Sequence, residues 1–100
     1  MSFARAWAIS EPQPDIVFEY LSKSTRVYDR TTKADTYLAL GVRELWLVDP
    51  DTLSIEVRHA ASRADRPVWE TFRYTSGDSA ASRVLKGWQV SVDEMFKGLV

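Results

Sequence analysis

The chain has 100 residues, 45% of them hydrophobic and 12% aromatic, which is enough for one globular domain and excludes the disordered class of protein. Thirteen basic and fourteen acidic residues give a net charge of −1, so the basic excess of a dedicated nucleic-acid-binding protein is missing. The absence of cysteine excludes disulfides and thiolate metal sites and favours a reducing, cytoplasmic location, and no apolar run of about 18 residues is present to span a membrane.

The first predicted element is a strand over residues 15–21. It follows Pro12 and Pro14, which disfavour a preceding helix, and it is rich in β-branched and aromatic residues. Five of its seven residues are apolar, which predicts an interior strand buried on both faces, with Glu19 as the exception.

A helix is predicted after this strand. Ser22–Thr25 is a polar turn that can cap a helix, and the residues from Val27 to Leu38 follow a spacing of three to four. Gly41 then stands at the position of a helix C-cap.

A continuous apolar run, Leu45–Val48, predicts a second buried strand. The run ends at Asp49, directly before a proline, and a turn role is favoured for this carboxylate over metal binding. Strand, helix and strand in this order form a βαβ unit, which predicts two parallel strands joined by a right-handed crossover.

Four basic residues lie within eleven positions around the start of the predicted helix: Lys23, Arg26, Arg30 and Lys33. Two interpretations are open for Lys23, Arg26 and Arg30. They either contact DNA phosphates, since cations on one surface neutralise a nucleic-acid backbone, or they form the solvated start of a helix.

Beyond Pro50 apolar and polar residues alternate, which predicts an antiparallel meander. Its strands are expected at residues 53–58, half exposed, at residues 68–74 and, after a turn at residues 75–78, at residues 83–90 with a bend at Gly87. Ser91 and Glu94 form a capping box that opens a short helix to about Leu99. The chain is therefore expected to have a mixed α/β fold.

His59 and three tryptophans are given structural interpretations. His59 is the only histidine and lies on an alternating strand, so it is interpreted as an ordinary surface residue. Trp46, Trp69 and Trp88 are interpreted as core or interface residues.

An ordered set of short motifs runs from Pro14 to about Leu99. The motifs are Pro14–Ser22, Ser24-Thr25, Asp29-Arg30, Lys33, Tyr37, Gly41-Val42, Glu44, Trp46, Val48–Pro50, Leu85–Trp88 and Val92–Phe96. Each motif is weak alone, but in this order and at these spacings they resemble the C-terminal half of the Uma2 family of restriction-endonuclease-like proteins. The resemblance implies a PD-(D/E)XK nuclease fold, here truncated, and metal-dependent hydrolysis of DNA phosphodiesters.

In this resemblance Glu19 matches the metal-binding carboxylate of the family. The position two residues later holds Leu21 instead of lysine, and Lys33 matches the lysine that the family places on the following helix. The implied cofactor is Mg²⁺, which a strand glutamate can bind through one carboxylate and waters. The lysine would stabilise charge in the transition state or orient the attacking water. An alternative stays open, in which Glu19 and Lys33 form only an ion pair, and Tyr37 is interpreted as core packing.

Part of the family's site has no counterpart in this sequence. The family takes another metal-binding aspartate from the strand that precedes the glutamate strand. Asp15 would lie about 13 Å from Glu19 along an extended strand, whereas ligands of one Mg²⁺ each lie about 2 Å from the ion. Residues 3–10 contain no carboxylate. The site is therefore expected to be incomplete in a single chain.

The same truncation is expected to expose a sheet edge beside the Glu19 strand that is apolar on both faces. Because such an edge favours association, we expect a homodimer through this edge, strand exchange, or coverage by residues 3–9. Residues 1–14 are assigned to an N-terminal segment, either a strand or a dimer arm, and residues 15–100 to a partial nuclease-like domain.

Two functions follow from these observations. The first is a metal-dependent endonuclease with DNA as its partner, active as a dimer or after joining a separate N-terminal piece. The second is a catalytically inactive remnant that serves as an oligomeric interaction module. DNA binding without cleavage has less support, because the basic cluster is small.

Overall fold

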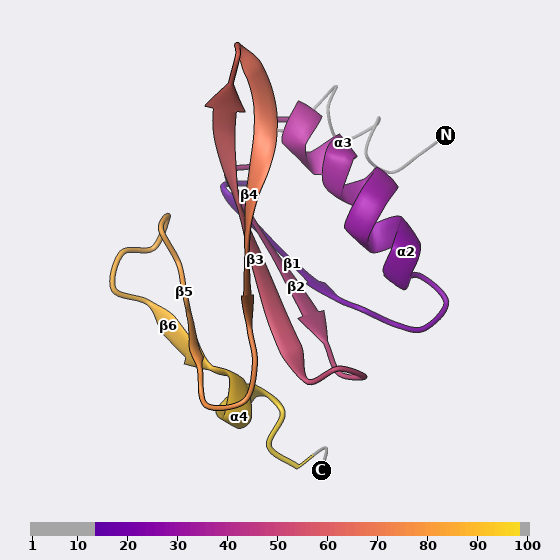
Figure 1. The fold of residues 1–100 in the computed structure, drawn as a ribbon, viewed down its shortest axis with the longest axis vertical. Helices are drawn as coiled ribbons and strands as arrows, with labels where there is room; N and C mark the ends of the chain where they lie inside the picture. The colour runs from indigo at the N-terminus through magenta and orange to yellow at the C-terminus, as the bar shows by residue number, and fades with distance from the viewer. Residues whose placement is uncertain (1–13, 99–100) are drawn as a thin grey trace.

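The computed structural model describes residues 14–98, whose arrangement is shown in Figure 1. At its centre is a four-stranded sheet in the order β1 (Ile16–Tyr20), β2 (Glu44–Asp49), β3 (Ser54–Arg63) and β4 (Arg66–Tyr74). β1 and β2 run parallel, and the other neighbouring strands run antiparallel. The predicted mixed α/β fold, with a βαβ unit followed by antiparallel strands, is confirmed.

The connection from β1 to β2 is a continuous helical segment, close to the predicted span. It consists of α2 (Arg26–Tyr28), one stretch of π-helix, η1 (Asp29–Lys33), and α3 (Ala34–Ala39). The π-helical stretch was not expected from the spacing of apolar residues. It inserts an extra residue into the helical repeat, and such insertions often occur at functional sites.

The helix ends at Gly41, as the sequence predicts. Gly41 has a φ of +90°, and its N–H donates to the carbonyl of Leu38 at 3.2 Å, while the N–H of Val42 donates to the carbonyl of Tyr37 at 3.0 Å. This pair of bonds is a Schellman motif, which needs a left-handed residue that glycine adopts without a steric penalty.

A second layer covers the opposite face of the sheet. It consists of the hairpin β5 (Ser79–Ala81) and β6 (Gln89–Ser91) and the short helix α4 (Val92–Met95). The Ser91 hydroxyl accepts a hydrogen bond from the N–H of Glu94 at 3.3 Å, which is one half of the predicted capping box. α4 ends at Met95, earlier than expected, and the predicted end near Leu99 lies outside the described residues.

The sheet therefore has a core on each face. On the helix side the buried residues are Leu21, Ala34, Tyr37, Val42, Leu45 and Leu47. On the hairpin side they are Trp46, Val48, Ile55, Val57, Ala80, Val92 and Phe96. β2 contributes to both cores and is buried along its whole length, which confirms the buried strand predicted from its apolar run.

The prediction of a half-exposed strand over residues 53–58 is wrong in part. Ser54–Val57 of β3 is buried, because the hairpin covers one face and the helix covers the other. His59, which was expected on the surface, is only 5% exposed and lies opposite Glu44 of β2. The alternation of apolar and polar residues in β3 predicted one face in water. The polar side chains of this strand instead contact other side chains beneath the covering elements.

Residues 83–90 do not form one bent strand. They make up most of the connection between β5 and β6, with Gly87 at a φ of +84°, and only residues 89–91 are paired as a strand. The carboxylate of Glu44 accepts hydrogen bonds from the Ser82 hydroxyl and from the N–H groups of Arg83 and Val84. The backbone of residues 82–84 therefore turns toward β2 instead of extending. The predicted turn at residues 75–78 is present between β4 and β5.

β1 differs from the interior strand that its composition predicts. Among the described residues it pairs only with β2 and forms one edge of the sheet. On its hairpin side Phe18 is 51% exposed, although its ring contacts that of Trp88 in the β5–β6 connection, and Tyr20 is 60% exposed. The predicted roles of residues 1–13, including coverage of this edge by residues 3–9, lie outside the described residues.

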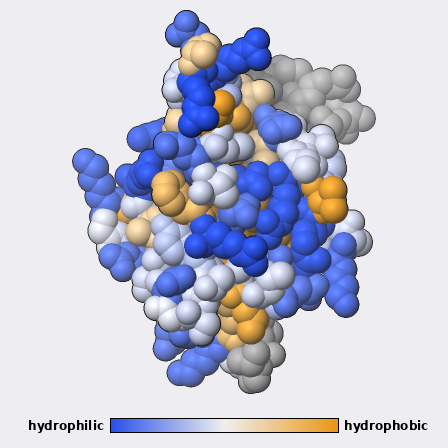
Figure 2. All heavy atoms as spheres, viewed as in Figure 1, coloured by the Kyte–Doolittle hydropathy of each residue, from blue (hydrophilic) through white to orange (hydrophobic). Residues whose placement is uncertain are grey.

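The surface is mostly polar on the face shown in Figure 2, where hydrophobic residues form small, separate areas. Of the helices in residues 14–98, none has the length and apolar character needed to cross a membrane.

Candidate active site

Glu19 and Lys33 are in direct contact. Alternation along β1 places Glu19 on the helix side of the sheet together with Val17 and Leu21. The Nζ atom of Lys33 lies 2.9 Å from Oε1 of Glu19. The two residues that the family resemblance assigns to catalysis thus come together across the interface between β1 and the helix.

Tyr37 completes the surroundings of the same carboxylate oxygen. Its hydroxyl donates a hydrogen bond to Oε1 of Glu19 at 2.5 Å, and the tyrosine is 6% exposed. Lys33 and Tyr37 are four residues apart, so they project from one face of the helix. Tyr37 does pack in the core, as predicted, but its hydroxyl also fixes the orientation of Glu19.

A second carboxylate lies on the other side of Lys33. Asp29, one helical turn earlier, is 5% exposed, and its Oδ1 is 3.7 Å from Nζ of Lys33. Its other oxygen accepts a hydrogen bond from the hydroxyl of Thr25 at 2.9 Å. Lys33 therefore stands between two acidic groups, both of which favour its charged form.

The environment sets the protonation states of the site. Partial burial acts to lower the pKa of Lys33, but the hydrogen bond and charge of Glu19, helped by Asp29, outweigh it and raise the pKa above its ordinary value of 10.5. Burial, followed by the hydrogen bond to Glu19, raises the pKa of Tyr37. At neutral pH Lys33 is therefore a cation and Tyr37 a neutral hydrogen-bond donor.

The described residues fit a divalent cation only in part. Lys33 and Tyr37 both engage Oε1 of Glu19, whereas Oε2 accepts no hydrogen bond from residues 14–98. That oxygen is a suitable ligand for Mg²⁺, which binds proteins through one or two carboxylates. No group of three or more acidic or histidine side chains able to hold a metal occurs among the described residues. Asp15 does not add a ligand, since its exposed carboxylate lies 3.7 Å from Arg43 at the start of β1.

A family model described as "Putative restriction endonuclease", Uma2, matches residues 4–93. The chain belongs to the Uma2 family. A solved structure with a similar fold is a "putative nuclease belonging to DUF820" from Anabaena variabilis, with a TM-score of 0.66 and 24% sequence identity. The match covers 87% of this Uma2 chain and 46% of the Anabaena chain, so the present chain spans less than half of that nuclease. No curated protein matches the sequence.

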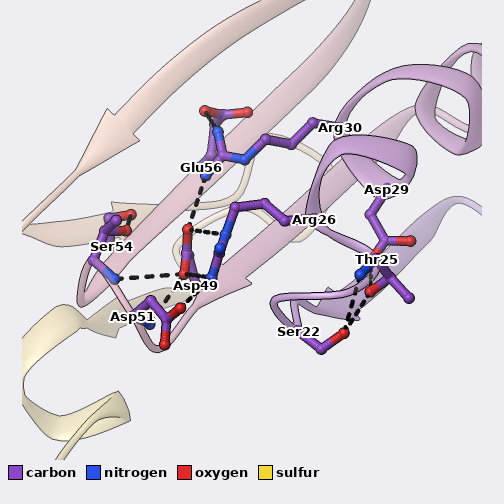
Figure 3. A network of polar contacts seen from close by, with 10 residues as sticks. Ser22, Thr25, Arg26, Asp29, Arg30, Asp49, Asp51, Ser54 and Glu56 are labelled. Carbon is purple, nitrogen blue, oxygen red and sulfur yellow. Dashed lines mark hydrogen bonds and ion pairs between the residues drawn. The ribbon is translucent and has the colours of Figure 1, made fainter.

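Two of the three cations predicted to contact phosphates are already paired in the Uma2 chain (Figure 3). Arg26 bonds to both oxygens of Asp49 at 3.0 Å and reaches Asp51 at 2.8 Å. Arg30 lies 3.2 Å from Asp49 and 2.8 Å from Glu56. These carboxylates neutralise both arginines, so the pairing weakens the case for phosphate contacts at Arg26 and Arg30.

Lys23 is the third predicted phosphate contact. It is exposed in the turn between β1 and α2 and forms no ion pair with residues 14–98. Its ammonium group remains accessible to an anionic ligand.

Asp49 has the turn role that the sequence favours. Its Oδ1 accepts hydrogen bonds from the N–H groups of Asp51 and Thr52, and its side chain is almost fully buried. Although burial alone would raise the pKa of Asp49, the hydrogen bonds from Arg26 and from the turn lower it. The carboxylate therefore anchors the β2–β3 turn to the helix.

A buried cluster around Glu44 was missed in the sequence analysis. Glu44 is fully buried on the hairpin side of the sheet. Its carboxylate accepts hydrogen bonds from the indole N–H of Trp46 at 2.8 Å, the hydroxyl of Ser82 at 2.7 Å and the backbone N–H of Arg83 at 2.8 Å. These bonds outweigh the effect of burial and lower the pKa of Glu44. A glutamate at the start of an apolar run was the available signal, because a charged residue inside a core needs partners.

His59 belongs to the same cluster. Its Nδ1 lies 3.1 Å from Oε1 of Glu44 but without the alignment of a hydrogen bond, which leaves this nitrogen unsatisfied among the described residues. Burial, and then the charge of Arg83, lower the pKa of His59 despite the opposing effect of Glu44. His59 is therefore a neutral, structural histidine at pH 7, on the face of the sheet opposite Glu19.

Proposed function

We propose that this Uma2 protein is a metal-dependent endonuclease that hydrolyses DNA phosphodiesters at Glu19 and Lys33. The observation that carries the proposal is the 2.9 Å contact between the carboxylate and the ammonium group at the two positions that match the family's site. Glu19 would hold Mg²⁺ through Oε2. The bound ion would polarise the scissile phosphate and lower the pKa of a water molecule.

Each neighbour of Glu19 has a role in this proposal. Lys33, a cation at neutral pH, would stabilise negative charge that develops on the phosphate or orient the attacking water. Tyr37 would hold Oε1 and so direct the second carboxylate oxygen toward the ion. Lys23, exposed in the turn between β1 and α2, is the remaining candidate for a phosphate contact. The cysteine-free composition fits the cytoplasmic location expected for such an enzyme.

The incomplete metal shell supports a second candidate function. Since the described residues supply one suitable carboxylate and not a cluster, the chain alone would bind a divalent ion weakly. In the alternative, the chain is a catalytically inactive interaction module in which Glu19, Lys33 and Tyr37 form only a structural ion-pair network. The two candidates differ in whether cleavage depends on the charge of Glu19.

Incubation of the purified protein with supercoiled plasmid and Mg²⁺ or Mn²⁺ tests the proposal. The wild-type protein and the control Glu94→Gln, which removes one exposed charge from α4, are expected to nick the plasmid equally. Glu19→Gln is expected to fall to background, and Lys33→Met to lose activity on the order of 100-fold. If wild type and Glu19→Gln both remain at background with both metals, the nuclease proposal is refuted and the interaction module is favoured.

A further inference from the structure

The hairpin of β3 and β4 continues past the end of β2 (Figure 1). The N–H of Ala60 in β3 donates to the carbonyl of Arg43 at 2.8 Å, one residue before the start of β2. Opposite Ala60, the indole N–H of Trp69 donates to the carbonyl of Ala34 in α3 at 3.0 Å. Residues 61–68 lie beyond both bonds and form a two-stranded arm, which is fixed at its base to the sheet and to α3.

The tip of this arm carries two arginines that face each other. Arg63 of β3 is the direct cross-strand neighbour of Arg66 of β4, and both residues are exposed. Ala64 and Asp65 form the turn between them with φ values of 51° and 62°, as in a type I′ turn. Like charges directly opposite each other destabilise a strand pair. The two arginines therefore cost stability in the free protein.

The charge at the tip is not neutralised within residues 14–98. Neither Arg63 nor Arg66 forms an ion pair there, whereas Arg83 lies 3.5 Å from Glu70, farther along β4. Asp65 is the only acidic residue of the arm, so two positive charges stand against one negative charge. Hydrophilic residues gather at the end of the molecule that the arm forms (Figure 2). An anionic partner would complement this end and relieve the repulsion.

The dimensions of the arm fit the major groove of DNA. Its strands lie about 4.8 Å apart, and three residues past the base give it a length of about 10 Å. The major groove is about 12 Å wide and about 8.5 Å deep, and it admits a two-stranded ribbon. Addition of a protein strand to the arm is less favourable, because Pro67 removes a backbone donor from β4.

We propose that the arm inserts into the major groove of a DNA duplex and that Arg63 and Arg66 bind the phosphates along it. The choice of DNA rests on the proposed function. In the register of the sheet, Glu19 is level with Leu47 of β2 and hence with Glu56 of β3. Arg63 lies seven residues farther along β3, which corresponds to about 23 Å. The arm therefore holds DNA away from Glu19 and takes no part in the cleavage step.

Fluorescence anisotropy with a labelled DNA duplex in EDTA measures binding without cleavage. The double variant Arg63→Gln/Arg66→Gln should raise Kd by about tenfold or more at about 0.1 M salt. It should also lower the slope of log affinity against log salt by about 2, since each phosphate contact contributes about 0.9. The control Lys86→Gln/Lys97→Gln removes the same charge from exposed positions outside the arm and should change both quantities much less.

Stability and a charge change of opposite sign show whether the arm acts through its arginines. Because the double arm variant removes a repulsion, its thermal midpoint should equal or exceed that of the wild type. Asp65→Asn keeps a residue that tolerates a positive φ and removes the negative charge of the turn. This variant should tighten DNA binding several-fold.

Competition identifies the groove. Methyl green, which binds in the major groove, should displace the protein, and netropsin, which binds in the minor groove, should not. The proposal is overturned if wild type does not bind the duplex, if methyl green fails to displace it, or if the double arm variant binds with unchanged affinity and salt slope.

These outcomes are independent of the nuclease function. Glu19→Gln should bind the duplex in EDTA at least as tightly as wild type, because it leaves the arm intact. Arm-dependent binding without any cleavage would uphold the inference and remove the nuclease. Cleavage that depends on Glu19 but is accompanied by unchanged DNA affinity in the arm variant would do the reverse.

Discussion

Lys33 lies 2.9 Å from Glu19, although the two residues are fourteen positions apart in the sequence. The contact joins the C-terminal part of β1 to the end of the π-helical stretch η1, and Tyr37 binds the same carboxylate oxygen one helical turn later. A charged pair at a partly buried helix–sheet interface is compatible with an inherited active site and with a structural ion pair. Single substitutions of its members separate their contributions.

The Lys33–Glu19 pair should stabilise the protein in a pH-dependent way. Because the pKa of Lys33 is raised in the folded state, its contribution is complete below the unfolded value near 10.5 and is lost as pH rises through the folded pKa. Urea unfolding should show wild type more stable than Lys33→Met at about pH 8, with the difference shrinking at about pH 11.5. An equal difference at both pH values would contradict this linkage.

The hydroxyl of Tyr37 should contribute to stability through Glu19. Tyr37→Phe removes the donor to Oε1 from a buried position, so the free energy of unfolding should fall by about 1 kcal/mol. Tyr28→Phe is the matched control, since Tyr28 is 55% exposed on the same helical segment and should change little. Urea titrations of both variants measure the effect, and equal losses would argue against a specific bond.

Glu44 should be more important for stability than any exposed glutamate. Glu44→Gln keeps the size of the side chain but replaces an acceptor of several hydrogen bonds by a group that also carries donors, inside a fully buried cluster. The free energy of unfolding should fall by about 2–4 kcal/mol, against about 0.5 kcal/mol or less for Glu94→Gln. The depressed pKa of Glu44 also predicts a contribution present above its ordinary value of 4.5 and lost in more acid solution.

His59 should titrate below its ordinary value of 6.5. As it is the only histidine, its imidazole proton signals in an NMR titration are unambiguous. A base with a depressed pKa in the folded state binds fewer protons there than in the unfolded state. Its contribution to stability is therefore present above pH 6.5 and is lost as pH falls through the folded pKa. A midpoint above 6.5 would show that the charge of Glu44 outweighs burial and Arg83.

The βαβ unit could be predicted because its signals are local. The apolar run of β2, the three-to-four spacing of the helix and the position of Gly41 each depend on residues within a few positions of one another. The pairing of Glu19 with Lys33 was anticipated through the family resemblance, and helical spacing then brings Tyr37 to the same face.

The sequence alone determined the order and type of these elements, since hydrophobic period and turn chemistry act between close neighbours in the chain. Only the tertiary structure decided that residues 83–88 turn instead of extending and that His59 is buried. The turn depends on the carboxylate of Glu44, whose bond to Ser82 spans 38 positions. The exposure of Phe18 and Tyr20 on the hairpin side of β1 was decided in the same way, because what covers the face of a strand is a property of the assembled fold and not of the strand.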